Sequence, residues 1–168
     1  MRVNNVHSRV FAVDSLEQVG ALIDSLATAD DRLWPHETWP ILRFDRPLGV
    51  GAKGRHGKIR YDVVEYQPAR RLRCAFTNPT GLHGYHEWAA RPVPGGYELR
   101  HSLIANTRGW LLLSWPLMWR PLHDALLEDA LDKAAGHLGM RAARTRWSGY
   151  VQALRRAAKV RRRPRVSV

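Results

Sequence analysis

Cysteine is almost absent from this sequence: Cys74 is the only one in 168 residues, which excludes a disulfide bond within the chain. Long apolar runs are absent too, because the most apolar stretch, residues 110–119, is far shorter than the ~20 residues that span a bilayer. The N-terminal residues lack the apolar segment of a secretory signal peptide. These features favour a reducing compartment, and we expect a cytoplasmic protein.

Acidic residues are missing from the C-terminal part of the chain. Residues 133–168 contain 11 Lys and Arg and no Asp or Glu, whereas residues 1–132 contain 16 basic and 15 acidic residues. The net charge of +12 therefore describes the tail and says little about the part that precedes it. We expect one folded domain over residues 1–138 and a basic amphipathic extension over residues 139–168.

Tryptophan, in contrast, is abundant, with seven residues. The apolar content of 45% and charged content of 25% are those of a globular protein, and the length suffices for one domain with a sizeable core. Seven large flat side chains indicate a core or a cavity with aromatic walls.

Three segments have helical patterns. Ser15 and Gln18 form a capping-box pattern, which predicts a helix to about Ala27. Residues 30–37 predict a short second helix, interrupted at Pro35. A long amphipathic helix is predicted from about residue 116 to residue 138, with Pro121 at its start or at a kink. Its apolar arc contains His123 together with Trp119, Leu126, Leu127, Ala130, Ala134 and Leu138.

The remaining patterned segments alternate apolar and polar residues, which is typical of strands with one buried face. The predicted strands cover residues 3–13, 41–44, 58–66, 71–76, 84–93 and 96–107. The turn at Pro94, Gly95 and Gly96 joins the last two as a hairpin. The apolar faces contain Leu42, Phe44, Ile59, Tyr61, Val63, Leu72, Cys74, Phe76, Trp88, Ala90, Leu99 and Leu103, and His86 and His101 share them.

This order of elements resembles the START-like superfamily, also called the polyketide cyclase and lipid-transport (SRPBCC) superfamily. The resemblance rests on the helix pair after the first strand, on VVEYQPARRL in mid-sheet and on RPLHDALLEDALDKAA near the end, and it covers about residues 3–138. It implies an α+β helix-grip fold, in which a curved antiparallel sheet grips a long C-terminal helix around an apolar cavity. Members include carriers of apolar molecules as well as aromatases and cyclases, so the resemblance leaves carrier and enzyme open.

Two other motifs have simpler interpretations. Gly49, Gly51 and Gly54 match G-x-G-x-x-G, but a strand rather than a helix follows them, which argues against a dinucleotide site and for a flexible loop. His83 and His86 lie three apart in a strand and therefore point to opposite faces, so they do not form a metal site together. No cofactor and no metal are expected.

The expected function is the binding of a small apolar or amphipathic ligand between the sheet and the long helix. The alternative is a polyketide cyclase-, aromatase- or dehydratase-like enzyme that uses His86, His101 and His123 as acids or bases. These histidines have an equally simple interpretation as hydrogen-bonded core residues. The expected ligand-binding residues are Trp39, Phe44, Tyr61, Phe76, His86, Trp88, His101, Leu103, Trp119, His123 and Leu127. Trp34, Trp39, Trp115 and Trp119 are candidates for the pocket mouth or for the core.

The tail predicts a basic amphipathic helix from Met140 to about Ala158, followed by RRRPR. Such a helix can lie on an anionic membrane or contact phosphates. It can also dock on the domain through Trp147 and Leu154 and leave its arginines in solvent. No motif for sequence-specific nucleic-acid binding is present, and the oligomeric state stays open.

Overall fold

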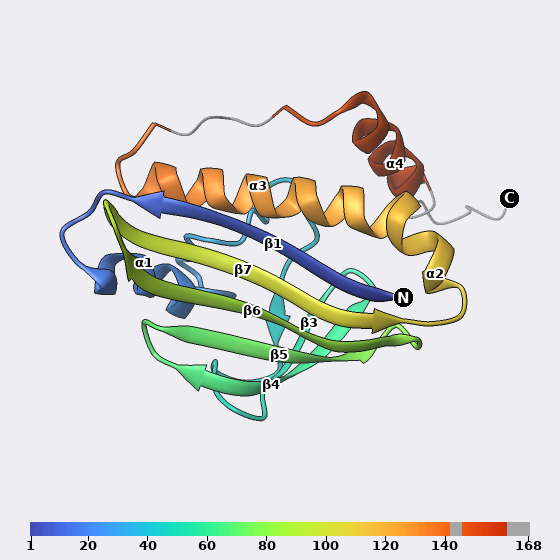
Figure 1. The fold of residues 1–168 in the computed structure, drawn as a ribbon, viewed down its shortest axis with the longest axis horizontal. Helices are drawn as coiled ribbons and strands as arrows, with labels where there is room; N and C mark the ends of the chain where they lie inside the picture. Colours follow the sequence, from blue (N-terminus) through green and yellow to red (C-terminus); the bar gives the residue numbers. More distant parts are fainter. Residues whose placement is uncertain (142–145, 161–168) are drawn as a thin grey trace, which may run out of the picture.

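The computed structural model describes residues 1–141 and 146–160, with the side chains of 158–160 excepted. Its centre is a seven-stranded antiparallel sheet with the order β1-β7-β6-β5-β4-β3-β2 (Figure 1). The strands are β1 (Arg2–Phe11), β2 (Arg43–Phe44), β3 (Lys53–His56), β4 (Ile59–Gln67), β5 (Arg71–Asn78), β6 (Leu82–Val93) and β7 (Gly96–Thr107). The chain therefore has the predicted α+β architecture, with β1 crossing over to pair with β7.

The first helix, α1 (Leu16–Asp24), begins as its sequence predicts. The Ser15 hydroxyl accepts a hydrogen bond from the Gln18 amide, and the Gln18 side chain accepts one from the Ser15 amide. The second predicted helix is reduced to a single turn, in which the Trp39 amide donates to the Pro35 carbonyl. Because Pro35 has no amide proton and Pro40 follows closely, the turn is not extended.

The long helix consists of three consecutive pieces: α2 (Leu111–Ser114), the π-helical η1 (Trp115–Trp119) and α3 (Arg120–His137). It begins earlier than predicted, and Pro121 lies in the first turn of α3. Because Pro121 has no amide proton, the Leu117 carbonyl lacks the amide partner that it would have in a regular helix. That carbonyl instead accepts a hydrogen bond from the Tyr150 hydroxyl.

The largest departure from the predicted strands is β3, which lies in the segment expected to be a flexible glycine-rich loop. Gly54 pairs with both Phe44 and Tyr61, and a Cβ atom at Gly54 would lie 2.1 Å from Cε2 of Tyr61. The Tyr61 ring therefore occupies the place of a side chain at this position. Gly54, which favours a loop in the sequence, thus leaves room for the Tyr61 ring to pack against the backbone of β3.

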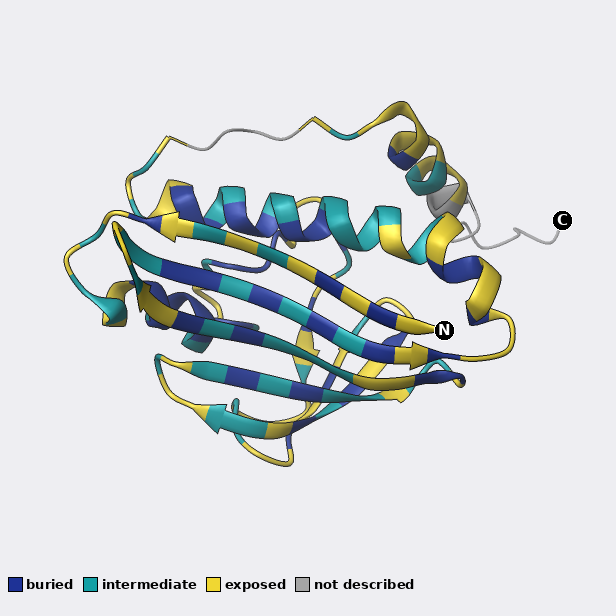
Figure 2. Cartoon of the chain, in the orientation of Figure 1, coloured by how far each residue is buried: buried dark blue, intermediate teal, exposed yellow. Residues whose placement is uncertain are grey.

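The predicted hairpin and the predicted strand faces are confirmed. β6 and β7 pair from Leu82↔Thr107 to Val93↔Gly96. Figure 2 shows buried and exposed residues alternating along the long strands, and the buried residues of α3 facing the sheet. The main core contains the apolar residues of both, including Val63, Leu99 and Leu131.

The tail helix is shorter than predicted: α4 (Gly149–Val160) begins well after Met140, and residues 142–145 lie outside the described residues. α4 lies beside α3 on the side away from the sheet (Figure 1). Arg155 from α4 lies between the rings of Trp39 and Trp147, with its Cζ 4.0 Å from each ring centre. The RRRPR sequence at residues 161–165 lies outside the described residues.

Candidate ligand cavity

A cavity of about 70 Å³ lies between the inner face of the sheet and the long helix. Its walls come from the segment between α1 and β2, from β2 to β7 with the turn between β5 and β6, and from α2, η1 and α3, so residues from most of the chain meet there. They are Leu26, Trp34, Leu42, Phe44, His56, Ile59, Tyr61, Leu72, Cys74, Phe76, Pro79, Leu82, His86, Trp88, His101, Leu103, Leu111, Trp115, Trp119, His123, Leu126 and Leu127. The lining is apolar and aromatic except for its histidines and Tyr61.

The structure brings the residues predicted for ligand contact together, with one exception. Phe44, Tyr61, Phe76, His86, Trp88, His101, Leu103, Trp119, His123 and Leu127 all line the cavity. Trp39 does not: it lines an outer groove, and its indole nitrogen donates to Asp129. Of the four tryptophans considered for the pocket mouth, Trp34, Trp115 and Trp119 line the cavity.

His56 is the polar lining residue that sequence reasoning missed. It ends β3 and contacts Trp34 and Tyr61, with ring centres 4.7 and 5.8 Å apart. Alternation would have found it only if β3 had been recognised as a strand. The glycines around it hid that signal.

Three predicted histidines form a continuous row inside the fold. The ring centres of His86 and His101 are 5.5 Å apart, and those of His101 and His123 are 5.2 Å apart. Trp88 packs edge-on against His101 at 4.8 Å. The order follows from the register, because His86 and His101 lie on the neighbouring strands β6 and β7 and His123 faces them from α3.

Burial makes these imidazoles poor bases. Desolvation lowers the pKa of His86 and of His123 to about 3, and lowers that of His101 well below its usual value. It lowers the pKa of His56 to about 4. All four rings are therefore neutral at physiological pH.

Neutral rings with unused nitrogens can recognise a polar group. His101 Nε2 and His86 Nδ1 are 3.4 Å apart, so one of them donates and the other accepts. A neutral imidazole has one donor and one acceptor. The outer nitrogens, His101 Nδ1 and His86 Nε2, therefore have opposite roles, and neither has a hydrogen-bond partner among the described residues. The pair can bind a hydroxyl or carbonyl, or shift a proton between two atoms of a bound molecule.

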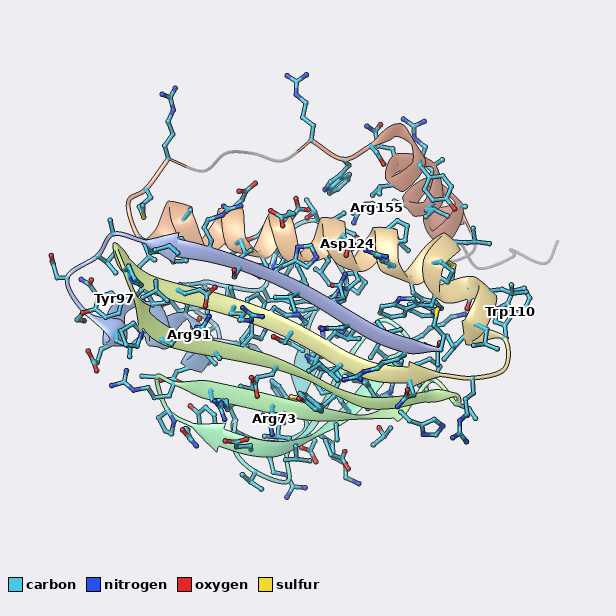
Figure 3. All side chains as sticks on the ribbon, viewed as in Figure 1. Arg73, Arg91, Tyr97, Trp110, Asp124 and Arg155 are labelled. Atoms are coloured by element: carbon cyan, nitrogen blue, oxygen red, sulfur yellow. The ribbon has the colours of Figure 1, made fainter. Side chains whose placement is uncertain are left out.

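A fourth histidine continues the row to the edge of the sheet. His7 on β1 lies 6.3 Å from His123, and its two ring nitrogens contact Glu128 at 2.8 Å and Asp124 at 3.0 Å. Hydrogen bonding to Asp124 and Glu128 raises the pKa of His7. Asp124 faces β1 in Figure 3.

His7, His123 and Asp124 also place three potential metal-ligand atoms within 4.8 Å of one another. Both nitrogens of His7 are used by carboxylates, so a metal would have to replace the proton that holds His7 between them. The cluster therefore fits an ion-paired imidazolium better than a metal centre.

No family model and no curated protein matches the sequence. Solved structures do match its fold. The di-domain ARO/CYC StfQ from the steffimycin biosynthetic pathway has a TM-score of 0.63 at 13% identity over 82% of this chain, and this chain covers 51% of that one. A norcoclaurine synthase point mutant from Thalictrum flavum, solved with a transition-state analogue, has a TM-score of 0.59 at 14% identity, covering 83% of this chain and 96% of that one.

This chain has the helix-grip fold. A third match, the KanY protein, has a TM-score of 0.60 at 13% identity and covers 83% of this chain and 99% of that one. The TM-scores establish the shared architecture, and identities this low establish no shared activity. The resemblance inferred from the sequence is thereby confirmed at the level of the fold.

Proposed function

We propose that this helix-grip protein binds a small apolar or amphipathic ligand in the space between its sheet and its long helix. The observation that carries the proposal is the lining itself: a largely apolar wall with a few convergent histidine nitrogens. Three of them, His86 Nε2, His101 Nδ1 and His123 Nδ1, have no hydrogen-bond partner among the described residues. Binding sites for small molecules have this composition. Burial of apolar ligand surface would supply affinity, at ~25 cal/mol per Å² before ordering costs.

The cavity is smaller than such a ligand needs. Its 70 Å³ has room for about two water molecules, whereas sites for drug-sized ligands usually enclose ~300–1,000 Å³. Part of the lining must therefore move when a larger molecule enters. We propose that α2 and η1 move, because Leu111, Trp115 and Trp119 line the cavity from a segment interrupted by a π-helix.

Binding is favoured over catalysis by the surroundings of the histidines. Within the described residues, no hydrogen bond joins His86, His101 or His123 to a carboxylate that would stabilise an imidazolium. The low pKa values make these groups poor general bases near neutrality. An isomerase or cyclase that passes a proton through the neutral His86–His101 pair remains the enzymatic alternative.

We expect protein purified without detergent to carry an apolar molecule at up to about one equivalent. Native mass spectrometry before and after extraction into organic solvent measures it. Leu103→Phe should fill part of the cavity and lower the occupancy, whereas Leu131→Phe, at a buried position outside the lining, should not. If nothing co-purifies and no apolar probe titrates with the folded protein, the proposal is wrong.

Contact with a membrane surface is a second candidate, and a specific observation favours it. The outer face of α2 and η1 exposes Trp110 (76%), Leu112 (44%), Leu113 (62%) and Leu117 (61%). Trp110 projects away from the sheet in Figure 3. Exposed Arg108 and Arg120 flank this segment, and the tail adds further positive charge. Apolar residues bordered by arginines are typical of elements that lie in the interface of an anionic bilayer.

None of the helices in the described ranges is both long and apolar enough to cross a bilayer. α2 and η1 also cover the cavity. Their movement would therefore open a path for a ligand between the bilayer and the cavity. The cytoplasmic location stays a prediction.

We expect the full chain to sediment with vesicles that contain about 30% anionic lipid, and to bind neutral vesicles at least tenfold more weakly. Leu113→Glu with Leu117→Glu should abolish sedimentation. Val50→Glu with Val64→Glu, at exposed valines elsewhere, is the matched control. Equal binding by the two double variants would contradict a role for α2 and η1.

A further inference from the structure

An outer groove of about 770 Å³ lies beside the β2 edge of the sheet. Its lining includes Ile41, with Arg43 and Arg55 on β2 and β3, and Leu122 on α3. Trp39, Trp147 and Arg155, which contact one another, form a further part of the lining. Its volume lies within the range of small-molecule sites, which the inner cavity does not reach.

The charge of this groove is unbalanced. Arg43 and Arg55 are direct partners across β2 and β3, and Arg55 is in turn the direct partner of Arg60 on β4. Like charges opposite one another destabilise a sheet. No salt bridge joins Arg43 or Arg55 to a carboxylate within the described part of the chain, whereas Arg46, close by, pairs with Asp45. An anion in the groove would offset this repulsion.

The aromatic wall of the groove is held in place. The indole nitrogens of Trp39 and Trp147 both donate to the Asp129 carboxylate, at 2.7 and 3.0 Å. Arg155 stacks on both rings and donates to the Thr38 carbonyl, and Figure 3 shows it between α4 and α3. Trp39 thus joins Trp147 and Arg155 of the C-terminal segment in a fixed aromatic surface, in which the two rings meet edge-to-face at 69°. The guanidinium groups of Arg43 and Arg55 line the same groove.

The groove and the inner cavity meet at His56, which lines both. A molecule with a charged end at Arg43 and Arg55 and an apolar body on the tryptophan wall would therefore have its far end next to the cavity. The groove is thus continuous with the cavity in which we propose that the apolar ligand binds.

We propose that the groove binds the anionic head of an amphipathic ligand, an organic carboxylate or phosphate with an aromatic or aliphatic body, through Arg43 and Arg55. The proposal rests on the proposed function, because the apolar body is expected to continue past His56 into the cavity. It adds the chemical class of the ligand. Guanidinium groups match carboxylate and phosphate oxygens in geometry as well as charge.

Two fluorescent probes that differ in one sulfonate test this proposal on the full chain. The anion 8-anilinonaphthalene-1-sulfonate is expected to bind at least tenfold more tightly than neutral N-phenyl-1-naphthylamine at about 0.05 M salt, and to lose this advantage at about 0.5 M salt. Arg43→Gln with Arg55→Gln should weaken the anion at least tenfold and leave the neutral probe within about twofold. Circular dichroism confirms that the variants are folded.

Arg46→Gln with Arg70→Gln removes the same total charge at exposed positions outside the groove lining, and should change neither affinity by more than about twofold. If the neutral probe binds and the sulfonate gives no advantage, or if the two double variants weaken the anion equally, the proposal for the groove is wrong while the apolar binding site stands. If neither probe binds, both proposals are wrong.

Discussion

Lowering the pH from about 7 to about 5 is expected to remove ~3–5 kcal/mol of the free energy of unfolding, because the folded protein keeps its inner histidines neutral. In the unfolded chain these histidines take up protons below a pKa of about 6.5. In the folded protein the pKa of His56 is about 4, and those of His86 and His123 are about 3. The unfolded state therefore binds more protons throughout this range, and acid favours it.

The sign follows from the direction of each shift. A histidine with a lowered pKa contributes fully to stability above about pH 6.5, and its contribution falls by up to ~1.4 kcal/mol per pH unit below that. His7 acts in the opposite direction, because its raised pKa stabilises the folded protein most below about pH 6.5. The inner histidines outnumber it. Carboxyl groups with lowered pKa values, such as Asp124, lose their contributions only at a lower pH.

Urea unfolding at several pH values between about 5 and 7.5 measures this dependence. His123→Leu should flatten it by about one proton, or ~1.4 kcal/mol per pH unit. His7→Gln should steepen it, because the variant loses the one histidine that favours the folded state in acid. A stability that stays constant down to about pH 5, or variants that change the slope in the same direction, would show that the inner histidines are solvated.

The inner surface of the fold could be predicted from sequence because it rests on period-2 and helical patterns. Ten of the eleven residues expected around a ligand line one cavity, since alternation fixes which side chains share a face once the strands are recognised. His86 and His101 are good examples: their strands were found, and the hairpin turn at Gly95 and Gly96 set their register.

What escaped prediction depends on contacts between distant segments. Trp39 was expected to contact the ligand, but Asp129 on α3 accepts its indole proton and Arg155 on α4 covers its ring. It therefore packs in the core and lines the outer groove instead of the cavity. The register that places Arg43 opposite Arg55 required β3, which its glycines concealed. The volume of the cavity could not be predicted from the sequence either. An apolar pattern indicates which way a side chain points, but not how completely neighbouring side chains fill the space.

Trp88→Ala is expected to destabilise the protein by ~3–5 kcal/mol and to make its stability depend on added indole. Trp88 is 3% exposed, lines the cavity from the middle of β6 and packs edge-on against His101. Its removal enlarges an existing apolar cavity by about the volume of an indole ring. If the site admits ligands from solvent, indole at about 100 times its dissociation constant should restore ~2.7 kcal/mol.

Leu99→Ala provides the matched comparison for this rescue. Leu99 is fully buried on β7 but lies outside the cavity lining, so its loss should cost ~2–5 kcal/mol with no recovery on addition of indole. Thermal unfolding of the wild type and of both variants, each with and without indole, separates the cases. Recovery confined to Trp88→Ala would mean that a flat apolar molecule reaches the histidine row. Failure to recover, with a folded variant, would mean that the space is sealed, and a sealed space cannot serve a ligand carrier.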